Sequence, residues 1–198
     1  MIFKEPIDIK IPDGKLTFHE GFFDLKESQV LQSRLIETIE WSQDEVIVYG
    51  KKHKIPRLNA WYGEEGKAMT YSGLTLEPKP WTKELIQIKE RIEKTTGYTF
   101  NSCLLNYYRD GKDGMGWHQD NEKELGKNPV IASLTFGETR PFQLKHISNT
   151  ELKKIDIPLT SGSLLIMAGE TQHYWKHQIP KTTRTLNPRL NLTFRKII

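Results

Sequence analysis

The sequence predicts a mainly β domain, a sandwich or jelly roll with two helices packed on the outside of one β core. Its 198 residues suit one domain with a sizeable core better than two independent ones. Helical periodicity is confined to two stretches, and both precede Gly97. Beyond Gly97, short runs rich in β-branched and aromatic residues follow one another at close spacing, separated by turn residues.

The first expected helix begins at Asp24, in the stretch DLKESQVLQSRLIETIEW. Asp24 suits an N-cap with Glu27 three residues on, and a stripe at helical spacing follows: Val30, Leu31, Leu35 and Ile39. The second lies in PWTKELIQIKERIEKTTG, where Pro80 suits a helix start and Gly97 a C-terminal cap. Its apolar stripe consists of Leu85, Ile88 and Ile92.

The expected strands fall into two groups. Between the helices, the runs EVIVY and RLNAWY are separated by GKKHKIP and could pair as a hairpin. After Gly97 the expected strands are FNSCLLNYY, PVIASLTF, RPFQLKH, KKIDIPL, GSLLIMA, HYWKHQI and LNLTFRKI. The loop RDGKDGMG, residues 109–116, contains three glycines and is expected to be the most flexible segment.

Composition narrows the class of protein. Charged residues make up 27% and hydrophobic residues 36%, which is typical of globular rather than disordered chains. Cys103 is the single cysteine, so no internal disulfide can form, which favours a reducing compartment: the cytoplasm, or the nucleus in a eukaryote. No apolar run approaches the roughly 20 residues of a membrane helix, and the N-terminus MIFKEPIDIK lacks a signal peptide's apolar stretch. We expect no membrane association and a monomer.

The net charge of +4 is unevenly distributed. Residues 1–50 hold five Lys or Arg against ten Asp or Glu, which leaves 24 against 15 for the remainder. A basic region of this kind concentrates polyanions, nucleic acids first among them. Many basic proteins bind no nucleic acid, however, so charge alone does not decide the partner.

The stretch Trp117-His118-Gln119-Asp120 carries two strong types of metal ligand. In a strand, His118 and Asp120 would point to the same face, because side chains alternate with a period of two. Two histidines and one carboxylate form the facial triad that holds non-haem Fe(II) and leaves positions open for substrate and oxygen chemistry. The third ligand would come from a later strand, and three histidines are candidates: His146, His173 and His177.

These histidines also fit roles that differ from an iron site. Taken alone, the His-x-Asp pattern is better explained by a surface His near a surface Asp. His173 and His177, four residues apart, would share a helix face as a zinc pair, although the neighbouring Tyr, Trp and Ile favour a strand. The composition does not favour a structural zinc site, because such sites are usually rich in thiolates and Cys103 stands alone.

The C-terminal run 189–195 alternates polar and apolar residues. One face would carry Arg189, Asn191, Thr193 and Arg195, and the other three apolar residues. Two guanidiniums on one face could bind a dicarboxylate through bidentate, charge-assisted hydrogen bonds. Asn106 and Tyr108, two residues apart on another expected strand, could add neutral donors. An edge strand with a solvated face explains the alternation about equally well.

A third cluster surrounds the turn after Val48. Tyr49 and Gly50 are followed by Lys51, Lys52, His53, Lys54 and Arg57. An aromatic residue at a glycine turn beside cations is a device that can enter a base stack while the cations hold phosphates. A core tyrosine beside a solvated basic loop is the ordinary alternative.

Together these motifs resemble the AlkB family of 2-oxoglutarate- and Fe(II)-dependent dioxygenases, in particular its nucleic-acid dealkylation repair branch. The resemblance runs from roughly Val46 to Ile198, so the acidic first residues lie largely outside it. Its motifs are SGLTLEPKPW, LNYYRDG, GWHQDNE, IASLTFG, GSLLIM, HQIP and PRLNLTFRKI.

The resemblance implies a fold, a reaction and a set of site residues. The fold is a double-stranded β-helix, a jelly roll flanked by two N-terminal helices and a nucleotide-recognition hairpin. One domain, 1–198, would comprise an N-terminal extension and helix (1–45), recognition hairpins and a helix (46–97) and the catalytic jelly roll (98–198). The implied iron ligands are His118, Asp120 and His177, and the implied 2-oxoglutarate ligands are Asn106, Tyr108, Arg189, Asn191 and Arg195, with Thr193 between.

The implied reaction is oxidative demethylation of N-alkylated DNA bases of the N1-methyladenine and N3-methylcytosine type, using Fe(II), 2-oxoglutarate and O2. It would release formaldehyde, succinate and CO2. Tyr49 matches the family's finger residue, which fills the gap left by a flipped base, and Tyr71 matches an aromatic that stacks on that base. Gly50, Lys51 and Arg57 would also contact the substrate.

Two departures from the family pattern bear on the substrate. Asn121, followed by Glu122, stands where close relatives carry a second acidic residue that faces the base, so the lesion range stays open. The segment 145–156 is short and only modestly basic, which leaves single-strand against double-strand preference open. The alternatives are the same chemistry on RNA or a protein side chain, and a non-catalytic nucleic-acid-binding module.

Overall fold

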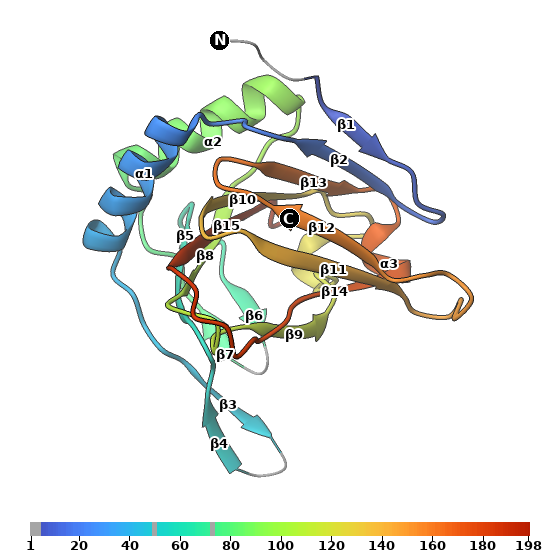
Figure 1. The fold of residues 1–198 in the computed structure, drawn as a ribbon. Helices are drawn as coiled ribbons and strands as arrows, with labels where there is room; N and C mark the ends of the chain where they lie inside the picture. Colours follow the sequence, from blue (N-terminus) through green and yellow to red (C-terminus); the bar gives the residue numbers. More distant parts are fainter. Residues whose placement is uncertain (1–4, 49–50, 72–73) are drawn as a thin grey trace.

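A computed structural model describes residues 5–48, 51–71 and 74–198. Two antiparallel sheets lie face to face, and two helices cover the outer side of the larger sheet (Figure 1). The smaller sheet has the order β12-β11-β14-β9, and the larger has the order β1-β2-β13-β10-β15-β8-β5. Two separate hairpins, β3-β4 and β6-β7, complete the fold.

The larger sheet consists of β1 (Ile7–Ile9), β2 (Lys15–His19), β5 (Leu58–Gly63), β8 (Ser102–Tyr108), β10 (Ile131–Gly137), β13 (Leu164–Ala168) and β15 (Arg189–Arg195). The smaller sheet consists of β9 (Met115–His118), β11 (Arg140–His146), β12 (Ile155–Leu159) and β14 (Trp175–Ile179). The hairpins are β3 (Glu45–Val48) with β4 (Lys51–Lys54), and β6 (Met69–Tyr71) with β7 (Leu74–Leu76). The helices are α1 (Leu25–Thr38), α2 (Lys83–Thr96), the short α3 (Thr171–Tyr174) and a 3₁₀ turn at Lys123–Leu125. No helix of the described ranges is long and apolar enough to cross a membrane.

The core is divided into two layers by the larger sheet. Its outer face packs on α1 and α2, through Leu35 of the first helix and the stripe Leu85, Ile88 and Ile92 of the second. Its inner face packs on the smaller sheet, where Leu104 and Leu165 belong to one cluster with Phe142, Leu144 and Trp175. The central strands of the larger sheet are therefore buried on both faces, and the predicted mainly β jelly roll with outer helices is confirmed.

Strand β15 lies in the middle of the larger sheet, between β10 and β8. Every one of its residues is at most 8% exposed, so the edge strand with a solvated face is excluded. The apolar side chains Leu190, Leu192 and Phe194 enter the helix-side core. The polar side chains between them must therefore enter the space between the two sheets, as the alternation predicts.

The strands expected after Gly97 all coincide with strands of the structure, and β9 adds one more, which ends at the His118 of the His-x-Asp motif. The expected capping box is present, because the Asp24 carboxylate accepts from the N–H of Glu27 and the Glu27 carboxylate accepts from the N–H of Asp24. Gly97 caps α2 in the left-handed region, with φ of 75°. The start expected at Pro80 is wrong: Thr82 is the N-cap, and its hydroxyl accepts from the N–H of Leu85.

The expected pairing of EVIVY with RLNAWY is also wrong. The run EVIV pairs instead with the basic run KKHK, as β3 with β4, and β5 joins the larger sheet beside β8. Gly50 and Tyr49 lie outside the described residues. The β3-β4 hairpin projects from the body of the molecule, at the bottom of Figure 1.

The glycine-containing loop 109–116 is packed, contrary to the flexibility expected from its composition. Asp113 is 4% exposed and accepts hydrogen bonds from the backbone N–H and the guanidinium of Arg109. A Cβ on Gly111 would lie 2.4 Å from the carbonyl oxygen of Arg184, so this glycine permits close approach of two loops. The N-terminal segment also contributes more than expected, since β1 and β2 extend the larger sheet beyond β13.

Candidate metal centre and anion pocket

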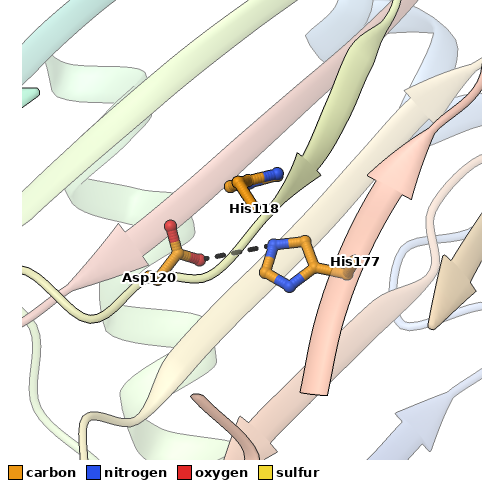
Figure 2. A group of neighbouring side chains, drawn as sticks. All are labelled: His118, Asp120 and His177. Carbon is orange, nitrogen blue, oxygen red and sulfur yellow. Dashed lines mark ion pairs between the residues drawn. The ribbon is translucent and has the colours of Figure 1, made fainter. Parts of the chain in front are cut away.

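Three potential metal ligands converge between the two sheets. His118 ends β9, Asp120 follows two residues later, and His177 lies on β14, the strand that pairs with β9 (Figure 2). His118 and His177 are direct register partners, and the ligand atoms of all three residues lie within 4.8 Å of one another. The Asp120 carboxylate lies 3.7 Å from Nε2 of His177. This confirms that the His-x-Asp motif and a third histidine form one cluster.

The two histidines have different surroundings. Nδ1 of His118 lies 2.9 Å from the carbonyl oxygen of Gly116, so a neutral ring that donates there keeps the Nε2 lone pair free for a metal. The His177 ring stacks on Phe142, with ring centroids 5.0 Å apart, and its Nδ1 has no hydrogen-bond partner in the described ranges. Both rings are thus oriented by their neighbours before any metal binds.

Burial sets the charge of each group. It lowers the pKa of His177 to about 3, with a contribution from nearby His118, and it also lowers the pKa of His118. Burial opposes ionisation of Asp120, but the Arg195 guanidinium and the two imidazoles hold the pKa of this carboxyl below its usual range. At neutral pH the cluster therefore offers two neutral imidazoles and one carboxylate. This donor set fits Fe(II) in a facial triad and is poor in the thiolates of structural zinc sites.

The other candidate histidines lie elsewhere. The His146 ring is buried beside Asp13, 3.3 Å from its carboxylate, and accepts backbone hydrogen bonds from Ser148 and Asn149. His173 lies in α3 and contacts Asn128 and the carbonyl oxygen of Lys127. Helix α3 ends at Tyr174, before His177, so His173 and His177 do not share a helix face as a zinc pair.

A pocket beside the triad is lined by the polar face of β15. The polar side chains that line it from β8 and β15 are Asn106, Tyr108, Arg189, Asn191, Thr193 and Arg195. In the sheet register, Asn106 lies opposite Asn191 and Tyr108 lies opposite Arg189. The structure therefore brings together all the residues that the sequence motifs associate with a dicarboxylate.

The two arginines of this pocket retain unused donors. Arg189 and Arg195 are 1% and 3% exposed, and in each the Nε and Nη1 groups have no partner among the residues described. Arg189 donates from Nη2 to the Thr135 hydroxyl, and Arg195 donates from Nη2 to the Asp120 carboxylate at 2.7 Å. Buried cations with free N–H groups are costly unless an anion binds them. The pocket thus fits a small carboxylate ligand such as 2-oxoglutarate, next to the metal ligand Asp120.

Ser133 and Gln172, which form hydrogen bonds with residues of this site, lie outside the predicted set. Ser133 lines the pocket on β10 and accepts a hydrogen bond from the Asn191 amide, 2.8 Å away. Gln172 accepts from the backbone N–H of Asp120 at 2.9 Å. The alternation of Ser133 and Thr135 with apolar residues in IASLTFG could have indicated the first, whereas nothing in the sequence indicates the second.

The residues proposed to contact a nucleic acid are only partly described. Lys52, His53 and Lys54 are exposed on β4. Tyr49 and Gly50 lie outside the described residues, and of Lys51 and Tyr71 only the backbone is described, at the start of β4 and the end of β6.

Arg57 does not belong to this exposed group. It is 5% exposed, and its Nε donates to the Asn106 amide oxygen at 2.7 Å. The prediction of an exposed basic cluster from Lys51 to Arg57 is therefore wrong at Arg57, because a side chain that anchors Asn106 is not available to surface phosphates.

Asn121 and Glu122 follow the triad carboxylate directly. Asn121 is exposed, and Glu122 is half-buried with one carboxylate oxygen, Oε2, unpartnered in the described part of the chain. Burial and the nearby Asp120 raise the pKa of Glu122. Neither residue is among those that line the pocket beside the triad, and their contact with a substrate stays a prediction.

Comparison with known proteins identifies the family. The model of the 2OG-Fe(II) oxygenase superfamily matches residues 15–195. The chain belongs to this superfamily. The match starts before Val46, so the family's fold includes β2, which precedes the range covered by the sequence motifs. Oxygenases of this superfamily are named for the iron and 2-oxoglutarate that the triad and the arginine pocket fit.

Individual relatives narrow the comparison. The chain is 44% identical over 192 residues to alpha-ketoglutarate-dependent dioxygenase alkB homolog 3 of Mus musculus, covering 93% of this chain and 66% of the relative. It is 43% identical over 191 residues to DNA oxidative demethylase ALKBH2 of Homo sapiens, covering 93% and 70%. These matches place it in the AlkB family.

A solved structure supports the fold independently. The structure titled "The structure of OsALKBH1" superposes with a TM-score of 0.66 at 17% identity, covering 96% of this chain and all of that chain. The chain spans 64 to 66% of the length of the alkB homolog 3 relatives from mouse and rat, just under two thirds.

Proposed function

We propose that this chain is a DNA oxidative demethylase that removes methyl groups from base nitrogens of the N1-methyladenine and N3-methylcytosine type. One observation carries the proposal. Two neutral histidines and one carboxylate form a cluster beside two buried arginines that have unused N–H donors. Relatives named DNA oxidative demethylase ALKBH2 support the choice of substrate.

The residues of the site have separable tasks. His118, Asp120 and His177 would hold Fe(II), which supplies oxidation of a methyl C–H bond by O2 while 2-oxoglutarate is converted to succinate and CO2. Arg189 would bind a carboxylate of 2-oxoglutarate through its free Nε and Nη1 groups, with Tyr108 beside it. Arg195 touches Asp120 and also keeps two free N–H groups, so it joins the metal ligand to the anion pocket.

The product of methyl oxidation decomposes without further catalysis by the triad. Insertion of one oxygen atom converts N–CH3 to N–CH2OH. The C–N bond then breaks with its electron pair going to the base nitrogen, while the hydroxyl loses its proton and becomes the carbonyl of formaldehyde. For a base that was cationic, this step restores the neutral form.

Access of a base to the buried triad requires extrusion from a duplex or a single-stranded substrate. The β3-β4 hairpin supports this step, because Lys52, His53 and Lys54 are exposed on a projecting strand that cannot pack against the core. Exposed cations of this kind contact phosphates without reading sequence. We therefore propose the hairpin as the part that holds the strand beside the extruded base.

The test is a panel of oligonucleotides, each with one methylated base, in single- and double-stranded DNA and in RNA. Purified protein is incubated with Fe(II), 2-oxoglutarate, ascorbate and O2, and base mass is followed by mass spectrometry. We expect loss of one methyl group in DNA with one succinate formed per methyl removed. His118→Ala should abolish the reaction, and the matched His19→Ala, on β2, should not. If only the RNA oligonucleotides lose a methyl group, the substrate is RNA and not DNA. If 2-oxoglutarate is consumed while every oligonucleotide stays unchanged, a nucleic-acid substrate is refuted.

A further inference from the structure

Asp120 is the one triad ligand that does not lie on a strand. Strand β9 ends at His118, and Asp120 follows in a loop, so regular pairing does not fix its backbone. Arg195 holds the carboxylate through Oδ1. A contact on the backbone side is therefore needed to fix the direction in which the Asp120 side chain leaves the chain.

We infer that Gln172 is a positioning residue that fixes the metal ligand Asp120. Gln172 is fully buried in α3, and its Oε1 accepts the backbone N–H of Asp120 at 2.9 Å. Its Nε2 faces Sδ of Met167, 3.6 Å away, which is a weak acceptor. The amide cannot be reversed without placing two donors face to face, so the acceptor is directed at Asp120.

A packing role explains this glutamine poorly. A fully buried amide is costly unless its groups are bonded, and an apolar side chain of the same length would fill the same space beside Met167. The strong hydrogen bond that Gln172 makes goes to the residue that also supplies the metal carboxylate. Its position thus serves the ligand, and among the described residues its side-chain oxygen accepts from the Asp120 N–H alone.

The surrounding contacts connect two ligands. Gln119 donates from Nε2 to the backbone carbonyl of Gln172 at 2.6 Å, so the α3 segment is tied to the Asp120 loop from both directions. The same segment continues directly into β14, which carries His177 five residues after Gln172. Partners that orient metal ligands typically change metal affinity about 10- to 100-fold when they are removed. Gln172 therefore couples the position of Asp120 to that of His177.

The inference rests on the metal site of the proposed function and not on the identity of the nucleic acid, so it is tested by metal binding alone. Gln172→Met removes the acceptor and preserves length. Mn(II), an octahedral stand-in for Fe(II), is titrated into metal-free protein while free Mn(II) is followed by electron paramagnetic resonance. We expect a Kd raised about tenfold, with a smaller thermal stabilisation by Mn(II) than in the parent protein.

The matched control is Gln32→Met on α1, away from the triad, which removes a donor to the carbonyl oxygen of Pro188. Its Mn(II) Kd should stay within about twofold of the parent value, because no ligand is touched. A Gln172→Met protein that melts earlier without metal but binds Mn(II) with the parent Kd would show a purely structural role and overturn the inference. If Gln172→Met does not fold, Gln119→Leu removes the second hydrogen bond between α3 and the Asp120 loop and should raise the Kd by up to about tenfold. An unchanged Kd there would overturn the inference too.

Discussion

Replacement of Arg189 by methionine should stabilise the metal-free protein against unfolding and should weaken its binding of 2-oxoglutarate. Burial lowers the pKa of Arg189 to about 10 from 12.5, which corresponds to about 3 kcal/mol of disfavoured charge. The variant also loses the hydrogen bond from Arg189 to Thr135, which costs about 1 kcal/mol of stability. The net gain of about 2 kcal/mol should raise the Tm of the metal-free protein by roughly 4 to 8 °C in a domain of this size.

The same substitution should cost ligand affinity. Loss of the free Nε and Nη1 donors removes charge-assisted hydrogen bonds worth about 3 kcal/mol together, which is roughly 100-fold in Kd for 2-oxoglutarate. Calorimetric titration of Mn(II)-loaded protein without O2 measures this affinity, and scanning fluorimetry of the metal-free protein measures Tm.

Arg140 provides the control for the stability half of this prediction. It is also buried, at 2% exposed, but its guanidinium donates to the carbonyl oxygens of Asp110, Asp113 and Pro180. Arg140→Met leaves those carbonyls unpaired and should lower the Tm. If Arg189→Met lowers the Tm as much as Arg140→Met does, or leaves the 2-oxoglutarate Kd unchanged, Arg189 is a structural residue and the reasoning is refuted.

Three further predictions concern pH, nucleic-acid binding and lesion choice. Because burial lowers the native pKa of His177 to about 3 from 6.5, the unfolded chain binds more protons between these two pH values. In that window the metal-free protein should lose up to about 1.4 kcal/mol of stability per pH unit on acidification, and a denaturation series in which His177→Leu shows the same slope would contradict this. Lys54→Gln, on exposed β4, should reduce the salt dependence of DNA affinity by about one phosphate contact, as measured by fluorescence anisotropy; an unchanged slope would remove Lys54 from the interface. Asn121→Asp should raise the preference for cationic over neutral methylated bases about fivefold in competition assays, and equal rates on both would exclude contact with the base.

Regular alternation makes much of this site predictable. The period of two in residues 189–195 places Arg189 and Arg195 on one face, and the structure confirms this because β15 is central and paired on both sides. The alternation cannot show that the polar face is buried rather than solvated. That depends on the smaller sheet, whose position is set by long-range packing.

The wrong predictions concern contacts that a local pattern does not contain. The partner expected for EVIV is wrong because KKHK, a run of exposed cations, has no apolar alternation, yet it forms β4 through backbone pairing. The expected exposure of Arg57 is wrong because its side chain is buried on Asn106. Asn106 is 49 residues away in sequence, so no local pattern indicates this contact. No sequence signal indicates Gln172, because its role depends on one distant backbone N–H.

The position of His118 on β9 affects which part of the smaller sheet unfolds first when the metal is absent. Strand β9 is one of the two edge strands of the smaller sheet and, in the described part of the chain, pairs on one side only, with β14. A metal ion held by His118 and His177 would act as a cross-strand clip at this free edge. Without the clip, amide hydrogens of residues 115–118 should be among the first of the smaller sheet to exchange with solvent. Loss of the metal would then cause local fraying of this edge strand. Strand β15, which is paired on both sides, would keep the anion pocket assembled.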